Sequence, residues 1–418
     1  MTMLYHLCHS LSSWADSQGI PLILARPKLS PDDFTGDDLD IIIPGTHVHA
    51  AFHHMQRLGT VLICRYDRAD GVTGYFYSKE HDTYFHVDFI TELSLKGIPY
   101  ISVSEIINRS WQQNGITYAD AVDQAVILVM THGIKHQQGN KLLPYYPFLQ
   151  QVIRQYPTAF LERLSHAIGD HAGADVYEAI MAQRPVICGY ADAVMAGWKT
   201  FGIAVLGTLL RYHAREIQRR FSMPVYRIAF LGVDGAGKST LIQELAKRLT
   251  KAFPHVVHTR FIPALPGQKE KDSTVAVANP HHAPNRSYFL SCLKLVYYYL
   301  RYWLVAYWPR RVPVLFLHDR YIADILVDPK RYRYAGPVLE KHLTLYPAPQ
   351  AYVYLDITAE TAWQRKQETN PQELIRQING YKKLSHHLSH FYVINGEGSI
   401  DDSRRQAEKI ILQVLTSP

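Results

Sequence analysis

The stretch LGVDGAGKST, Leu231 to Thr240, decides the fold of the second half of this chain. It fits the pattern Gly-x4-Gly-Lys-Ser/Thr through four residues: Gly232, Gly237, Lys238 and Ser239. An apolar run precedes it, and the following LIQELAKRL has helical spacing. Glycines let the backbone curl so that its N–H groups point inward, and the start of a helix adds a partial positive charge. The stretch therefore predicts a phosphate-binding loop between a strand and a helix, with Lys238 reaching the outer phosphates.

Strand-like apolar runs alternate with helical stretches after Pro224. The runs are YRIAFL (226–231), HVVHTRFI (255–262), VPVLFLHD (312–319), AYVYLDI (351–357) and FYVIN (391–395). Continuous apolar runs of this kind are typical of parallel strands that helices cover on both faces. Residues 224–418 are therefore predicted to form an α/β domain with a five-stranded parallel sheet.

The first half of the chain has a different pattern. Between Pro21 and Ile90 short strand-like runs (PLILA, DLDIII, YFYS and YFHVDFI) alternate with turn residues, whereas AVDQAVILVMTHGIKH and PFLQQVIRQY further on have helical spacing. We predict an α+β domain over residues 1–192, with a helical C-terminal portion, and a helical connector over 193–223. The length agrees, because 418 residues of which 47% are hydrophobic can bury two cores and exclude a disordered chain.

Charge and cysteine content indicate the surroundings of the protein. The 44 Lys and Arg residues against 37 Asp and Glu give a net charge of +7, which favours phosphate-bearing ligands. The four cysteines form no CxxC pair, as is typical of a reducing compartment. The N-terminus lacks a basic start followed by an unbroken apolar stretch. The sequence therefore predicts a cytoplasmic protein.

One segment is long enough to be tested as a membrane span. Tyr288 to Trp308 is apolar and rich in rings, but Lys294 and Arg301 lie inside it, where charges are costly in a bilayer. We interpret the segment as an amphipathic helix packed on the protein. A peripheral contact with a membrane surface stays open, because Arg310 and Arg311 follow directly.

Four ordered motifs make residues 224–418 resemble the thymidylate kinase family. They are GVDGAGKST with its internal acidic residue, HDRY (318–321), LDITAETAWQRKQETNPQEL (355–374) and INGEGSIDD (394–402). The resemblance implies ATP and Mg²⁺ as cofactors. The nucleotide contacts that it implies come from seven loop residues: Gly232, Asp234, Gly235, Gly237, Lys238, Ser239 and Thr240.

The same resemblance assigns roles around the reacting phosphate. Ser239 and Asp319 would hold Mg²⁺, the latter through water, and Arg320 would contact the acceptor phosphate. Arg365 is a candidate cation of the lid segment. A phosphoryl group in transfer spreads negative charge over its oxygens, so cations around it stabilise the transition state. The predicted catalytic set is Lys238, Asp319, Arg320 and Arg365.

The acceptor side departs from that family. The family's Arg-Glu-Pro segment is absent, and IADILVDPKRYRYAGP (322–337) replaces the Tyr-Gln pair that reads the base. This form resembles the thymidylate-kinase-like proteins associated with bacterial surface-polysaccharide genes. Because Arg331 and Arg333 flank Tyr332, we expect an acceptor with more anionic charge, and poor turnover of dTMP. The predicted acceptor site comprises Arg320, Tyr321, Arg331 and Arg333.

Paired acidic strands mark the first half of the chain. Asp38 and Asp40 alternate in DLDI, so they point to one face of a strand, and Asp88 lies in the later strand HVDF. Carboxylate oxygens suit Mg²⁺, so the three residues are a candidate metal site. The pattern resembles the nucleotidyltransferase superfamily over residues 1–190, but Ala25-Arg26-Pro27 stands where that superfamily has a Gly-Ser or Gly-Gly turn that holds the triphosphate. Arg26 is a candidate to replace that turn as a phosphate contact. An active domain, a silent domain that binds a ligand and a solvated acidic turn stay open.

The predicted function is ATP-Mg²⁺-dependent phosphotransfer to a small acceptor. The acceptor is a nucleoside monophosphate or a sugar-type intermediate of surface-polysaccharide synthesis. Two alternatives stay open, namely a nucleic-acid end-processing kinase with nucleotidyltransferase activity and a non-catalytic nucleotide-sensing partner. Nucleic acid is not expected as a partner, because the basic residues do not interleave with aromatic ones in a stacking pattern. A homodimer also stays open.

Overall fold

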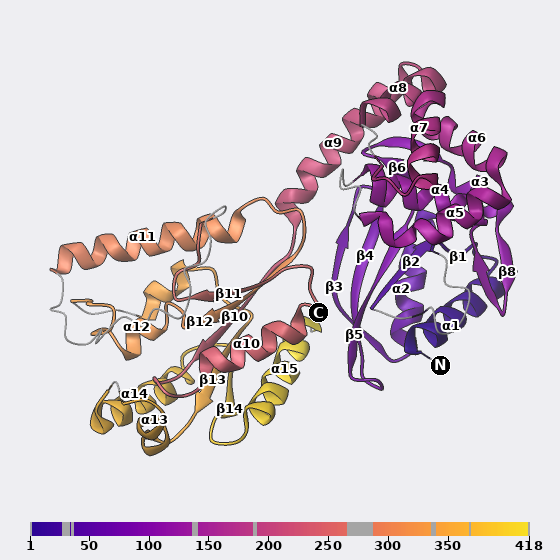
Figure 1. The fold of residues 1–418 in the computed structure, drawn as a ribbon. Helices are drawn as coiled ribbons and strands as arrows, with labels where there is room; N and C mark the ends of the chain where they lie inside the picture. Colours follow the sequence, from indigo (N-terminus) through magenta and orange to yellow (C-terminus); the bar gives the residue numbers. More distant parts are fainter. Residues whose placement is uncertain are drawn as a thin grey trace. The chain divides into compact units, whose positions relative to one another are not determined.

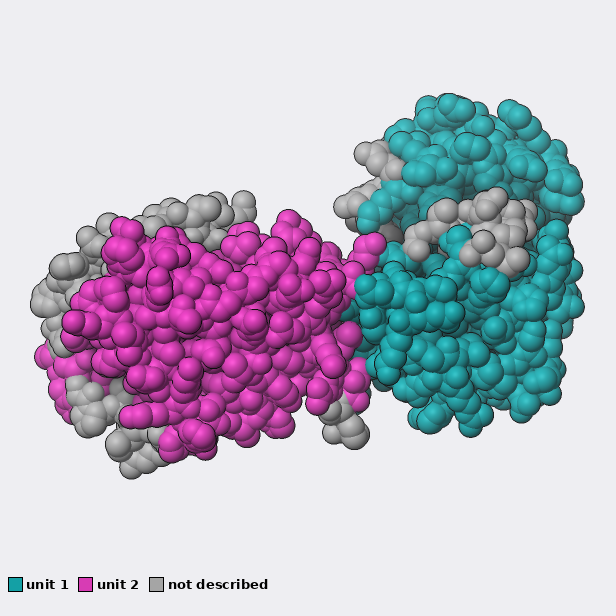
Figure 2. Space-filling model, turned by 90° about the horizontal axis from the view of Figure 1, so that it is seen from below, with its two compact units in different colours: residues 1–219 teal, residues 220–418 magenta. Residues whose placement is uncertain are grey.

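The computed structural model describes residues 2–26, 34, 37–135, 141–186, 190–265, 287–335, 340–367 and 369–416. Contacts divide the chain into two compact units, residues 1–219 and 220–418, which Figure 2 colours separately. Each unit has its own main sheet (Figure 1). Among the described residues, no helix is long and apolar enough to cross a membrane.

The second unit is built on a five-stranded sheet in which every pairing is parallel. Its strands are β10 (Val225–Leu231), β11 (Val256–Arg260), β12 (Val314–Asp319), β13 (Ala351–Asp356) and β14 (Phe391–Asn395). Their order is β11-β12-β10-β13-β14, so the strand that leads into the phosphate loop is central. The predicted five-stranded parallel sheet is confirmed.

Helices connect these strands. They are α10 (Lys238–Leu249), α11 (Tyr288–Tyr307), α12 (Asp324–Val327), α13 (Ala359–Arg365), α14 (Pro371–Leu384) and α15 (Ile400–Thr416). Helices α10 and α15 contact one another; α10 also contacts β11 and β12, and α15 contacts β13 and β14, so the two cover one face of the sheet. Helix α14 contacts α12 and α13.

The first unit contains a mixed seven-stranded sheet in the order β3-β4-β5-β2-β1-β9-β8. Its strands are β1 (Ile23–Leu24), β2 (Asp38–Ile42), β3 (Thr60–Asp67), β4 (Gly71–Ser78), β5 (Thr83–Ile90), β8 (Trp111–Gln113) and β9 (Ile116–Tyr118). A separate hairpin pairs β6 (Leu93–Leu95) with β7 (Ile98–Ile101). Strand β2 pairs parallel to β5 and antiparallel to β1. The mixed sheet agrees with an α+β domain, and the resemblance to nucleotidyltransferases stays a prediction.

Helices pack on both faces of this mixed sheet. The α-helices that precede β10 are α1 (Met3–Ser17), α2 (Val48–Arg57), α3 (Val103–Arg109), α4 (Ala121–Leu128), α5 (Tyr146–Gln155), α6 (Pro157–Ile168), α7 (Asp170–Met181), α8 (Tyr190–Phe201) and α9 (Ala204–Ser222). Apolar residues of α1 and α2 form one core with Leu39 and Ile41 of β2. Ile42 lies in a second core, with residues of α4 to α8. The alternation along β2 therefore directs Asp38 and Asp40 to the side of the α4–α8 helices.

The helical connector is not one helix. It consists of α8 and α9, which are separated at Gly202 with φ +56°. A positive φ is easily adopted by glycine and cannot continue a right-handed helix. The segment predicted as a helical connector over 193–223 thus contains two helices, and α9 includes residue 219, at which contacts divide the chain.

Candidate phosphate-binding site and acidic cluster

Three glycines give the loop between β10 and α10 its shape. Gly232, Gly235 and Gly237 have φ values of +146°, +86° and +88°. A Cβ atom on Gly235 would lie 2.4 Å from the carbonyl oxygen of Ala362 in α13. Gly237 is in the left-handed conformation and precedes the first turn of α10. The backbone thus requires glycine where the loop passes α13 and where it enters the helix.

Lys238 is folded over this loop. Its ammonium donates to the carbonyl oxygens of Gly232 and Val233, both at 2.8 Å, and its side chain is buried. Burial and the nearby Arg320 together lower the pKa of Lys238 to about 8, although Asp319 and Asp234 oppose the shift. A phosphate in the loop would replace carbonyl oxygens by charged oxygens as partners, which would favour the ammonium form. The arrangement therefore has the chemistry of an anion site.

Ser239 and Asp319 form the second part of the site. The Ser239 hydroxyl donates to Oδ2 of Asp319 at 2.5 Å, across the gap between the start of α10 and the end of β12. Burial opposes ionisation of Asp319, but Lys238, Arg320 and the Ser239 hydrogen bond outweigh it, and the pKa of Asp319 is lowered. A hydroxyl and a carboxylate are oxygen ligands of the kind that Mg²⁺ prefers. The two residues therefore fit a magnesium site beside the phosphate loop.

Arg320 is held between two carboxylates. Its guanidinium donates to Oδ1 of Asp234 at 2.6 Å and to Oδ2 of Asp324 at 2.7 Å, and only 7% of the residue is exposed. Asp234 also accepts a hydrogen bond from Arg331. Burial opposes ionisation of Asp234, but the guanidiniums of Arg320 and Arg331 hold its pKa well below the usual range. The sequence predicted Asp234 as a nucleotide contact, and in the structure it links the loop to two of the three predicted acceptor arginines, Arg320 and Arg331.

Asp324 is a site residue that the sequence reasoning missed. Its carboxylate is fully buried and accepts hydrogen bonds from Arg320, from the Tyr332 hydroxyl at 2.7 Å and from the Tyr381 hydroxyl. Three donors from three different segments therefore meet on one carboxylate. The available signal was an acidic residue inside the apolar run YIADILV, because a charge at such a position must be paired if the run is buried.

The remaining predicted site residues differ in burial and in their contacts. Tyr321 is fully buried and donates its hydroxyl to the carbonyl oxygen of Pro347. Arg365 ends α13, is exposed and donates to the carbonyl oxygen of Gly396 at 3.0 Å. Thr240 is exposed in the first turn of α10. Arg333 is half-buried with φ +52°.

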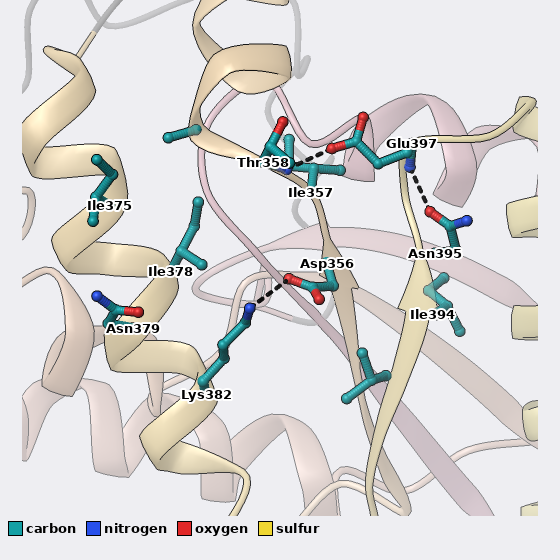
Figure 3. A pocket seen from close by; sticks show the side chains of 12 residues that line it. Asp356, Ile357, Thr358, Ile375, Ile378, Asn379, Lys382, Ile394, Asn395 and Glu397 are labelled. Atoms are coloured by element: carbon teal, nitrogen blue, oxygen red, sulfur yellow. Dashed lines mark hydrogen bonds and ion pairs between the residues drawn. The ribbon is translucent and has the colours of Figure 1, made fainter.

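A groove of about 500 Å³ lies at the carboxyl ends of β13 and β14 (Figure 3). Isoleucines of α14 line one side of it, and Lys382 of α14 is directed at Asp356 across it, at 3.7 Å (Figure 3). Glu397 closes one end by accepting from the backbone N–H of Thr358 at 2.5 Å. The neighbouring Gly396 borders the phosphate loop, because a Cβ on it would lie 3.7 Å from the carbonyl oxygen of Ala236. Open α/β sheets bind ligands at this edge.

The acidic cluster of the first unit is assembled by strand pairing. Asp40 of β2 and Asp88 of β5 are register partners on adjacent parallel strands. Arg26 donates to Oδ2 of Asp38 at 2.8 Å and pairs with Asp40. Arg68 donates to Oδ2 of Asp88 at 2.6 Å. The structure therefore brings the three predicted carboxylates together and places a guanidinium on each side of them.

The guanidiniums of Arg26 and Arg68 supply the positive charge beside the three carboxylates that the sequence analysis expected from Mg²⁺. Burial raises the pKa of Asp40 to about 6, with Arg26 opposing the shift and Asp88 and Asp38 adding to it. Among the residues that the structure describes, no group of three or more His, Cys, Asp or Glu side chains is arranged to hold a metal ion. Arg26, considered from the sequence as a phosphate contact, is instead bound to Asp38 and Asp40.

Comparisons with known proteins match only part of the chain. No protein-family model and no curated protein matches it. Thymidylate kinase from Ehrlichia chaffeensis is 16% identical, and the match covers 45% of this chain and 99% of that chain with a TM-score of 0.29. Deoxyadenosine kinase from M. mycoides is similar in two structures, at 14% and 15% identity, with 44% of this chain and 97% of that chain covered and a TM-score of 0.29. All three matches leave more than half of this chain uncovered.

Proposed function

We propose that the second unit is an ATP- and Mg²⁺-dependent phosphotransferase that acts on a small anionic acceptor. The observation that carries the proposal is the grouping of Lys238, Ser239 and Asp319 at one end of the parallel sheet, around a loop shaped by glycines. A buried lysine on loop carbonyls provides a phosphate site, and a hydroxyl beside a carboxylate provides metal ligands. The groove next to Gly396 offers room for the remainder of a nucleotide.

Different residues of the site would bind the phosphates, hold the metal ion and contact the transferred phosphoryl group. Lys238 would exchange its carbonyl partners for phosphate oxygens and neutralise charge as the phosphoryl group moves. Ser239 and Asp319 would hold Mg²⁺, which when bound neutralises charge on the phosphates. Arg320 is fixed by Asp234 and Asp324, so its guanidinium is oriented before any ligand arrives.

Arg331 defines the acceptor side of the proposal. It reaches Asp234 of the phosphate loop from the segment that follows α12, so an acceptor anion bound by Arg331 would lie next to the loop. The adjacent ring does not offer a stacking surface, because Tyr332 is 8% exposed and its hydroxyl is bound to Asp324. We therefore favour an acceptor recognised by its phosphate or carboxylate, such as a sugar phosphate, over a base-selective pocket for dTMP.

A panel of acceptors tests this function. Purified protein is incubated with ATP and Mg²⁺ and with nucleoside monophosphates or sugar phosphates, and ADP and the phosphorylated product are measured by mass spectrometry. We expect one anionic acceptor class to yield ADP and product in equal amounts, and EDTA to abolish both. ATP binding without ADP formation across the panel would instead support a nucleotide-sensing protein, and preferential turnover of dTMP would contradict the proposed acceptor class.

A further inference from the structure

Helix α11 has two apolar faces, and the residues that the structure describes pack against only one of them. Ser291, Tyr298, Tyr302 and Val305 form the buried face. On the opposite side six large apolar residues are between 47% and 70% exposed. We call these six residues the α11 stripe; they are Phe289, Leu293, Val296, Leu300, Leu304 and Tyr307. Their spacing of three or four residues continues over the length of the helix. A contiguous exposed apolar surface of this kind marks an interaction site, whereas scattered exposed residues do not.

The buried face of α11 is firmly attached to the second unit, along whose outside the helix runs (Figure 1). The indole N–H of Trp303 donates to the carbonyl oxygen of Leu345 at 2.6 Å. The Tyr346 hydroxyl donates to the carbonyl oxygen of Leu295 at 2.8 Å, and the Ser291 hydroxyl accepts from the backbone N–H of Ala335 at 3.1 Å. These bonds fix the orientation of the helix about its axis, so the α11 stripe is held on the outer side.

The two cations inside the helix are directed toward the protein. Lys294 donates to the carbonyl oxygen of Tyr332 at 2.8 Å. Arg301 donates to the carbonyl oxygen of Pro263 at 2.5 Å and to the Tyr297 hydroxyl at 2.7 Å. The α11 stripe itself therefore contains no charged residue, while cations lie along its borders.

We propose that α11 is an interfacial helix that lies flat on an anionic lipid bilayer with the α11 stripe inserted among the acyl chains. A helix with an apolar face, bordering cations and rings of Tyr, Phe and Trp is typical of such a position. Residues 287–318 contain four cations, Lys294, Arg301, Arg310 and Arg311, and no Asp or Glu. Since no helix among the described residues can span a membrane, this contact would be peripheral.

Charge favours a bilayer over a second copy of the chain as the occupant. If two α11 helices paired through their stripes, two segments that each carry four cations and no carboxylate would be brought together, and neither segment would neutralise the charge of the other. Anionic headgroups supply that counter-charge, at about 1 kcal/mol for each Lys or Arg near the surface. The inference concerns where the protein acts and does not depend on phosphotransfer.

Vesicle flotation of the full chain tests the proposal. One set of vesicles contains phosphatidylcholine with about 30% phosphatidylglycerol, which gives the bilayer the negative surface charge of an anionic leaflet. The other set contains phosphatidylcholine alone. The test variant is Phe289→Gln/Leu293→Gln/Leu300→Gln, and the matched control is Leu206→Gln/Leu210→Gln/Ile217→Gln on α9, where the three residues are 49–64% exposed. Thermal unfolding followed by circular dichroism checks that each variant is folded.

We expect the unaltered protein and the α9 control to float with anionic vesicles, and the α11 variant to lose at least tenfold in partitioning, consistent with three inserted apolar side chains. Unaltered protein that stays with the dense fraction overturns the proposal. So does flotation that the α9 substitutions abolish and the α11 substitutions leave intact. A dimer in light scattering that the α11 variant converts to monomer, without vesicle binding, would assign the stripe to a second copy instead.

Discussion

The Arg320 guanidinium donates to the buried carboxylate of Asp324 at 2.7 Å and at the same time to Asp234 of the phosphate loop at 2.6 Å. This arrangement joins three parts of the second unit, because Asp324 also accepts from Tyr332 in the proposed acceptor segment and from Tyr381 in α14. Arg320 is therefore oriented by the protein. Asp324 acts through Arg320 and is a positioning residue.

Replacement of Asp324 by Asn should separate positioning from binding. The amide has nearly the same shape but lacks the charge that fixes Arg320, and a misplaced transition-state contact can cost about 10²-fold in rate. We expect ADP formation to fall by about that factor, while the Kd of ADP changes by about threefold or less because Asp324 does not contact the loop.

Tyr381→Phe is the matched control for Asp324→Asn. It removes one neutral donor to Asp324 and leaves the ion pair between Asp324 and Arg320. We therefore expect the rate of ADP formation to fall by at most about fivefold, which corresponds to about 1 kcal/mol. Equal effects of the two variants on ADP formation would show that the charge of Asp324 does not orient Arg320.

Gly235 and Gly237 offer a paired test of the loop geometry. Both have a positive φ, but a Cβ on Gly235 would also lie 2.4 Å from the carbonyl oxygen of Ala362. A Cβ on Gly237 would have no atom of a non-adjacent described residue within 4 Å. Gly237→Ala should cost only the left-handed strain, about 1–2 kcal/mol. Gly235→Ala should lower the melting temperature further and weaken ADP binding more. The reverse order in both measurements would contradict the described path of the loop past α13.

Nucleotide affinity should depend on pH through Lys238. Its pKa in the free protein is lowered by burial to about 8, and binding to phosphate requires the ammonium form. Above pH 8 the bound state takes up a proton that the free state lacks, so the affinity for ADP should fall by up to about tenfold per pH unit. The nucleotide-free protein should meanwhile gain stability between pH 8 and 10.5, since there the unfolded chain binds the extra proton. Calorimetric titration at pH 7 to 9.5 measures the affinity, and a flat profile would mean that Lys238 stays charged.

Removal of Arg26 should uncover a cation site in the first unit. Arg26→Gln removes the guanidinium that pairs with Asp38 and Asp40, and these two carboxylates then lie beside Asp88 without that counter-charge. We therefore expect the free energy of unfolding of this unit to fall by about 2–3 kcal/mol. Mn²⁺ should raise the melting temperature of the variant at pH 8 and leave that of the unaltered protein unchanged. Lys135→Gln is the control, because Lys135 pairs with Asp70. If Mn²⁺ leaves the melting temperature of Arg26→Gln unchanged, the three carboxylates cannot share a metal ion.

The sheet of the second unit could be predicted because its strands are buried on both faces. Such strands are continuous apolar runs, and YRIAFL over 226–231 corresponds to β10 (Val225–Leu231). Strand β3 (Thr60–Asp67) was not predicted, since its sequence TVLICRYD mixes buried, half-buried and exposed positions. The phosphate loop could be found because its residues are adjacent in sequence.

Contacts between distant segments could not be predicted. Tyr381 and Asp324 are far apart in the chain and meet only through the packing of α14 on α12. The pairing of Arg26 with Asp38 and Asp40 follows no periodicity rule, so the acidic pattern alone indicated a metal site. Sequence patterns identify which side chains lie on one helix or strand. Which residues of other elements form hydrogen bonds or ion pairs with those side chains depends on the tertiary structure.

Phosphotransfer at the loop is tested by ADP formation from ATP by the full chain, compared with Lys238→Ala, in the presence of Mg²⁺ and the acceptor that the panel identifies. The proposed phosphotransferase predicts ADP and phosphorylated acceptor in equal amounts for the unaltered protein. Lys238→Ala should yield neither above background while retaining the unaltered circular dichroism spectrum and melting behaviour. Turnover by Lys238→Ala at the rate of the unaltered protein would contradict the account, because the reaction would then occur elsewhere than at the loop of residues 231–240.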